Sequence, residues 1–119
     1  MPSNSHSCFV IACFCAAWCR TCDDYVRVFD LLKKSYAEHA EVVWVDIEDQ
    51  AELLDDVDVE NFPTLLVSDR QQVYFWGTVL PHVSTATQLI DRVMSGATGG
   101  IDAPDILALN QRLRSYFFS

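Results

Sequence analysis

The feature that most constrains the fold is an apolar run that leads directly into a pair of closely spaced cysteines. Residues 9–14 are almost unbroken hydrophobic, a pattern typical of a central strand buried on both faces. Cys19 and Cys22 follow at once, and a helix is predicted over residues 23–40. Its expected inner face is formed by side chains at helical spacing, namely Val26, Phe29, the stem of Lys33 and Tyr36, with Leu32 alongside. The sequence therefore predicts a thiol pair at the point where a buried strand turns into a helix.

The rest of the chain alternates between strand and helix patterns. Further strands are expected at residues 41–47, 64–67 and 73–76, and further helices at residues 50–57 and 85–94. The polar turn between the last two strands predicts a hairpin. This order predicts an α/β fold with a mixed central sheet of about four strands and helices on its faces.

The C-terminal segment predicts one more helix. Residues 95–100 are rich in glycine and are expected to form a linker. A helix is then predicted over residues 102–117, because its first turn contains a proline. The apolar face of that helix is formed by Ile106, Leu109, Leu113 and Phe117. We expect residues 1–95 to form the domain and residues 96–119 to join the same structural unit, with the helix packed on the sheet. A dimerisation or partner-binding helix is the alternative.

Composition narrows the classes of partner. The chain has 119 residues, the size of one domain, and a net charge of −9. An acidic surface disfavours nucleic acid and anionic membrane, because both attract basic proteins. No stretch is long enough to span a bilayer, and residues 1–7 contain no lysine or arginine of the kind a signal peptide carries. These features predict a cytoplasmic protein.

The five cysteines favour redox chemistry over a structural disulfide scaffold. All of them lie between Cys8 and Cys22, whereas a scaffold uses an even number spread through the chain. The N-terminus of a helix presents free N–H groups to Cys19, and Arg20 adds a cation beside it, so the thiolate is favoured. Cys19 is therefore predicted to be the attacking thiol, and Cys22, which two residues separate from it, the resolving one.

Zinc is the competing interpretation of the cysteines. Four thiolates are available in sequence, from Cys13, Cys15, Cys19 and Cys22. However, Cys13 and Cys15 are embedded in apolar neighbours on one strand face, without the polar turns of a zinc knuckle. We therefore expect no metal, and we expect the remaining cysteines to be small buried hydrophobes, namely Cys8, Cys13 and Cys15. Surface positions without a catalytic role are expected for His6, His39 and His82.

Three motifs together resemble the thioredoxin family. Residues 16–22 read Ala-Ala-Trp-Cys-Arg-Thr-Cys, which is similar to the Trp-Cys-x-x-Cys active site of that family. Residues 61–64 read Asn-Phe-Pro-Thr, which resembles its cis-proline loop, and Trp76-Gly77 resembles the end of its last strand. The resemblance covers residues 8 to about 95 and implies a thioredoxin-like fold.

The resemblance also implies roles for single residues. Pro63 is expected to follow a cis bond, which only X-Pro bonds readily adopt, and to lie against the cysteine pair. The backbone of Phe62 is then expected to bind an extended substrate segment, and Trp18 to shield the cysteines and contact partners. Arg20 and Thr21 replace the usual dipeptide between the cysteines and are expected to tune the redox couple.

The sequence departs from the family in ways that bear on mechanism. Cys13 stands where the family has a buried aspartate that removes a proton from the resolving cysteine, Trp44 replaces the accompanying lysine, and Cys15 replaces an aromatic residue. Family members usually begin with another strand and helix, and because only residues 1–7 precede the apolar run here, that unit is not expected in this sequence. A buried thiol cannot act as a base at neutral pH, so slower turnover is expected. Asp46 could substitute for the aspartate, but capping of the strand end is the favoured interpretation.

These observations predict a protein-disulfide oxidoreductase. Its substrates are expected to be disulfides of other proteins, and its only redox group the Cys19–Cys22 disulfide, with no further cofactor. A reductase such as thioredoxin reductase is the expected electron donor, and the expected state is a monomer. The alternative is a thioredoxin-like protein-binding module whose cysteine pair is idle or regulatory.

Overall fold

The computed structural model describes residues 9–16, 19–55, 57–59, 61–69, 72–79, 82–96 and 99–118. The elements follow in the order β1 (Phe9–Cys15), α1 (Arg20–Ser35), β2 (Ala40–Asp46), α2 (Ala51–Leu54), β3 (Thr64–Ser68), β4 (Val73–Thr78), α3 (Val83–Met94) and α4 (Pro104–Phe118). No helix within these ranges combines the length and the apolarity needed to cross a membrane.

The four strands form one mixed sheet in the order β2-β1-β3-β4. β1 pairs in parallel with β2 and antiparallel with β3, and β3 and β4 form the expected antiparallel hairpin. β1 has neighbours on both sides and is buried from its second residue onward, as its apolar run predicts. The predicted mixed sheet of about four strands flanked by helices is confirmed.

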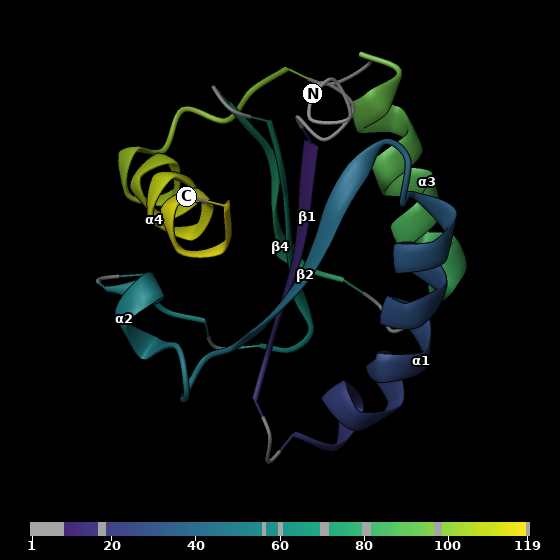
Figure 1. The fold of residues 1–119 in the computed structure, drawn as a ribbon, viewed down its shortest axis with the longest axis horizontal. Coiled ribbons are helices and arrows are strands. Elements are labelled where there is room, and N and C mark those ends of the chain that lie inside the picture. The colour runs from purple at the N-terminus through teal and green to yellow at the C-terminus, as the bar shows by residue number, and fades with distance from the viewer. Residues whose placement is uncertain are drawn as a thin grey trace.

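Helices cover both faces of the sheet (Figure 1). α1 and α3 lie on one face, α2 and α4 on the other. Because side chains alternate along a strand, β1 contributes to both cores. Ile11 and Cys13 pack in the core under α1 and α3, while Val10, Ala12 and Phe14 pack in the core under α2 and α4.

The C-terminal helix packs on the sheet of its own chain, as predicted. Ile106, Leu109 and Leu113 are buried in the same core as Phe14. α4 also holds α2 in place, since the guanidinium of Arg112 donates to the carbonyl oxygens of the last two residues of α2 at 2.8 and 3.1 Å. The helix begins two residues later than predicted, at Pro104.

The first helix differs from its prediction in both extent and orientation. It runs over Arg20–Ser35, not residues 23–40, because the chain turns at Tyr36 and enters β2 at Ala40. The expected inner face included Val26, whose side chain is 45% exposed. The buried face is instead formed by Cys22, Tyr25, Val28 and Leu32. Starting the helix at Arg20 turns Cys22 toward the sheet.

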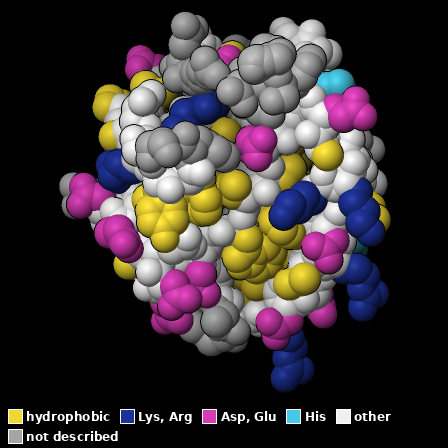
Figure 2. Space-filling model, viewed as in Figure 1, with side chains coloured by type: hydrophobic (Ala, Val, Ile, Leu, Met, Phe, Trp, Pro, Cys, Tyr) yellow, Lys and Arg dark blue, Asp and Glu magenta, His cyan; other side chains and the backbone are white. Residues whose placement is uncertain are grey.

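The surface of the molecule carries its acidic side chains in a dispersed pattern. Figure 2 shows them spread around the viewed face, with hydrophobic side chains in its middle. The net charge of −9 is therefore not concentrated in a single patch of that face.

Candidate redox site

The junction of β1 and α1 brings three cysteines together. Cys15 is the last residue of β1, Cys19 is the N-cap of α1, and Cys22 lies in the first turn of that helix. The backbone N–H of Cys19 donates to the carbonyl of Ala16 at 3.0 Å, so the chain turns tightly between strand and helix. Trp18, the expected shield of the cysteines, lies outside the described residues.

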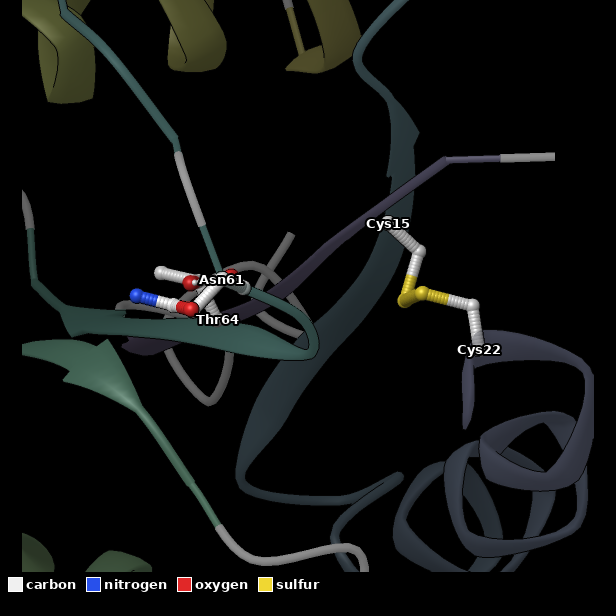
Figure 3. The surroundings of a disulfide bond; sticks show 4 residues. All are labelled: Cys15, Cys22, Asn61 and Thr64. Atoms are coloured by element: carbon white, nitrogen blue, oxygen red, sulfur yellow. Dashed lines mark hydrogen bonds between the residues drawn. A yellow bond between two sulfur atoms is a disulfide. The ribbon is translucent and has the colours of Figure 1, made fainter. Parts of the chain in front are cut away.

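The disulfide of this junction joins Cys15 to Cys22, not Cys19 to Cys22 as the sequence analysis expected. Figure 3 shows the bond reaching from the end of β1 to the start of α1. The two Cα atoms are 5.7 Å apart, within the ordinary range for a disulfide. The expectation that Cys15 is only a small buried hydrophobe was therefore wrong.

The face of β1 explains this pairing. Cys15 follows Cys13 by two residues, so its side chain points to the face of the sheet on which α1 lies. The inner face of α1 begins with Cys22. The signal in the sequence is the same-face spacing of Cys13 and Cys15, which argues against zinc and also directs Cys15 toward the face that α1 covers.

Cys19 is a free thiol and is partly exposed. It has the extended backbone of an N-cap residue (φ −90°, ψ 121°), and its carbonyl accepts the N–H of Asp23 at 3.2 Å. The unpaired N–H groups of a helix's first turn are found at this end of α1. Arg20 and Thr21 follow Cys19 directly in the first turn of α1. Arg20 is exposed and Thr21 is partly buried.

The loop before β3 borders the same end of the sheet. The Phe62–Pro63 bond is cis, as predicted. Because Phe14 pairs with Thr64, Pro63 stands beside the end of β1, next to Cys15. The Thr64 hydroxyl donates to the carbonyl of Asn61 at 2.7 Å and closes the loop (Figure 3).

A groove of about 220 Å³ lies beside this loop. Its lining residues come from the segment before the loop, from the loop itself and from the end of β4, and include Asp58, Asn61, Trp76 and Thr78. The groove thus continues the surface formed by the cis-proline loop.

Cys13 occupies the place of the family's buried acid and is itself wholly buried. Burial raises the pKa of its thiol well above the ordinary value, so Cys13 stays protonated at neutral pH, as expected. Tyr25 of α1 lies in the same core, and burial together with the nearby Cys13 raises the pKa of its hydroxyl. Within the described residues the Tyr25 hydroxyl has no hydrogen-bond partner. Neither side chain is suited to take a proton from Cys22.

Asp46 caps the end of β2, which was the favoured interpretation. Its Oδ1 accepts the backbone N–H groups of Glu48 at 2.9 Å and Asp49 at 3.1 Å. In the sheet Asp46 pairs with Cys15. Trp44, in place of the family's lysine, packs its ring edge-on against Phe29 with centroids 5.2 Å apart.

The described residues contain no group of three or more histidine, cysteine, aspartate or glutamate side chains arranged to hold a metal ion. His39 and His82 are exposed, as expected. His6 and Cys8 lie outside the described residues. The absence of bound zinc stays a prediction.

Raising the pH above about 9 should destabilise the fold through Cys13. The pKa of the Cys13 thiol is 9.0 as its ordinary value, and burial raises it in the folded state. The free energy by which the buried thiol favours the folded state is therefore fully present below pH 9.0 and is lost as the pH rises above it. The loss is at most about 1.4 kcal/mol per pH unit for this group. The free energy of unfolding, measured with urea at about pH 8 and about pH 10, should therefore fall less for Cys13→Ala than for the wild type.

Tyr25 and Tyr36 also lower the free energy of unfolding at high pH, in the wild type and in Cys13→Ala. Both have raised pKa values, Tyr36 through burial and its hydrogen bond to Asp91, so both proteins lose some stability above about pH 10. An equal loss in wild type and Cys13→Ala would contradict the assignment to Cys13.

Comparisons with known proteins identify related structures. Residues 3–89 match the family model described as Thioredoxin. The germline-specific thioredoxin Deadhead of Drosophila melanogaster aligns with a TM-score of 0.66 and 18% identity, over 76% of this chain and 85% of that chain. Fasciola hepatica thioredoxin aligns with a TM-score of 0.64 and 20% identity, over 75% and 85%. Plasmodium falciparum thioredoxin aligns with a TM-score of 0.63 and 23% identity, over 74% of this chain and 84% of that chain.

No curated protein sequence matches the chain. The solved structures show the same fold as this chain.

Proposed function

Because the chain belongs to the thioredoxin family, we propose that it is a thiol–disulfide oxidoreductase acting on disulfides of other proteins. Family membership and the neighbouring cysteines support a thioredoxin-like redox role. The observation that carries the proposal is the free, partly exposed thiol of Cys19 at the N-terminus of α1, one helical turn from Cys22.

The reaction needs both cysteines in the reduced state. The Cys19 thiolate attacks one sulfur of the substrate disulfide, so the substrate bond breaks and its second sulfur leaves as a thiolate. Cys22 then gives up its proton and attacks the Cys19 sulfur, releasing the first substrate sulfur. Two electrons pass to the substrate and a Cys19–Cys22 disulfide remains. A reductase such as thioredoxin reductase in the cytoplasm restores the dithiol.

Substrate binding is assigned to the surface beside the cysteines. The backbone of Phe62 offers hydrogen bonds to an extended segment, Pro63 holds that backbone at the end of β1, and Trp18 adds an apolar contact. The groove beside the loop, which Asn61 and Trp76 help to line, supports this placement. Arg20 and Thr21 tune the potential of the couple from the first turn of α1.

A protein-binding module is the second candidate. It is favoured by the wholly buried Cys13 at the position of the proton-accepting acid, since this substitution removes a group that assists turnover. In that case the same surface docks a partner, and thiol exchange regulates docking.

Reduction of insulin disulfides separates the two functions. Cys19→Ser should bring the rate to the uncatalysed background, and Cys22→Ser should accumulate mixed disulfides between Cys19 and the substrate. Cys13→Ala is the matched control, because it removes a thiol from the same strand and leaves the exchanging pair. A wild-type rate no faster than that of Cys19→Ser would contradict the oxidoreductase and leave the binding module.

A further inference from the structure

We propose that Cys15 is a third redox residue, which shares Cys22 with Cys19 and stores the oxidised protein as a buried Cys15–Cys22 disulfide. The proposal deepens the proposed oxidoreductase function. It rests on that function in one respect, because the oxidoreductase reaction is what forms the Cys19–Cys22 disulfide. The observation that carries it is the bond itself, together with a free Cys19 thiol at the same junction.

Solvent exposure gives the three sulfurs different roles. Cys15 is 1% exposed and Cys22 is 2% exposed, whereas Cys19 is only partly buried. An external thiol can therefore reach Cys19, but it cannot reach either sulfur of the Cys15–Cys22 bond without opening the β1–α1 junction. Cys19 is thus the only one of the three through which electrons enter or leave the closed site.

The exchange conserves atoms and electrons. Cys15 attacks the Cys22 sulfur of a Cys19–Cys22 disulfide, and the Cys19 thiolate that departs takes up the Cys15 proton. The Cys15–Cys22 bond forms, the Cys19–Cys22 bond breaks, and Cys19 leaves as a thiolate. The departing Cys19 is the N-cap residue of α1, next to the unpaired N–H groups of the first helical turn. No oxidant or reductant is consumed, because one disulfide replaces another.

The reverse exchange is the route back to the dithiol. Cys19 attacks the Cys22 sulfur, Cys15 is released as a thiol after taking up a proton, and the accessible Cys19 sulfur is again open to a reductase. Until that happens Cys22 cannot resolve a mixed disulfide on Cys19. The stored form therefore protects Cys22, while Cys19 can still attack a substrate disulfide and stay joined to one substrate sulfur as the other leaves as a thiolate.

Disulfide mapping tests the stored bond directly. The oxidised protein is alkylated under native conditions, then cleaved after Phe14, Trp18 and Arg20, which separates Cys15 from Cys19 and both from Cys22. Mass spectrometry should find residues 15–18 linked to the fragment that carries Cys22, and an alkylated Cys19. Finding only Cys19 linked to Cys22, with Cys15 as a thiol, would overturn the proposal.

Two variants test the roles of the outer cysteines. Cys15→Ala should shift the oxidised protein to a Cys19–Cys22 disulfide and protect Cys19 from alkylation, whereas the matched control Cys13→Ala, on the same face of β1, should map like the wild type. Cys19→Ser should keep the Cys15–Cys22 bond and be reduced by glutathione about tenfold or more slowly, because the junction must first open. Reduction of Cys19→Ser at the wild-type rate would show that electrons reach the Cys15–Cys22 bond without passing through Cys19, and would contradict the proposal.

The two proposals fail in different ways. A protein that carries the Cys15–Cys22 bond but reduces no insulin supports the stored disulfide and contradicts the oxidoreductase. A protein that reduces insulin and maps only as Cys19–Cys22 contradicts the stored disulfide and supports the oxidoreductase.

Discussion

Deleting residues 96–119 should lower the melting temperature of the monomer by about 15 °C or more. The deletion removes α4, which buries Ile106, Leu109 and Leu113 against one face of the sheet. At about 1.5 to 3 kcal/mol for each buried aliphatic side chain, the lost burial amounts to roughly 5 to 9 kcal/mol, less the entropy of ordering the helix. That is a large part of the stability of an ordinary domain.

Thermal melting followed by circular dichroism measures this effect, and binding of a hydrophobic dye reports the sheet face that the deletion exposes. Gln111→Ala in the full chain is a suitable control, because Gln111 lies on the exposed side of α4. A truncated chain that keeps its melting temperature and loses only self-association would show that α4 acts as a dimerisation helix.

Asn110→Ala should lower the free energy of unfolding by about 2 to 3 kcal/mol, although it deletes only a small polar group. Asn110 is 1% exposed, and its Oδ1 accepts the hydroxyl of Ser68 at 2.7 Å. Its Nδ2 donates to the carbonyl of Asp69 at 3.2 Å, so the side chain ties α4 to the end of β3. The substitution leaves the wholly buried Ser68 hydroxyl without this acceptor, which costs more than the hydrogen bond contributes.

Urea unfolding of Asn110→Ala, Ser68→Ala and the double variant measures the coupling. The double variant should lose less stability than the sum of the two single variants, because both partners of the buried bond are then absent. Gln111→Ala again serves as the neighbouring control. Strictly additive losses would show that Asn110 and Ser68 stabilise the fold independently.

The order of elements could be predicted from sequence because each element carries its own local signal. The apolar run of β1 is long enough to mark a strand buried on both faces, and the turn before Val73 marks the hairpin. The face of α4 was predictable for a similar reason. Ile106, Leu109 and Leu113 are spaced three and four residues apart and are all buried, and Phe117 packs against the same core.

The orientation of α1 was not predictable in this way. Its sequence offers competing apolar positions, and Val26 and Leu31 stay exposed while Tyr25 and Leu32 are buried. Periodicity cannot choose between two stripes that differ by a rotation of the helix. The choice depends on how the helix docks against β1 and α3.

The sequence by itself determined the class of chemistry at this site, because the spacing of Cys19 and Cys22 at a strand-to-helix turn and the Phe62–Pro63 loop are local features. Only the tertiary structure decided which sulfur bonds to Cys22. That choice depends on the contact between the last residue of β1 and the first turn of α1. Such a contact forms when the helix packs on the sheet and turns Cys22 toward Cys15, and no spacing along the chain encodes that rotation.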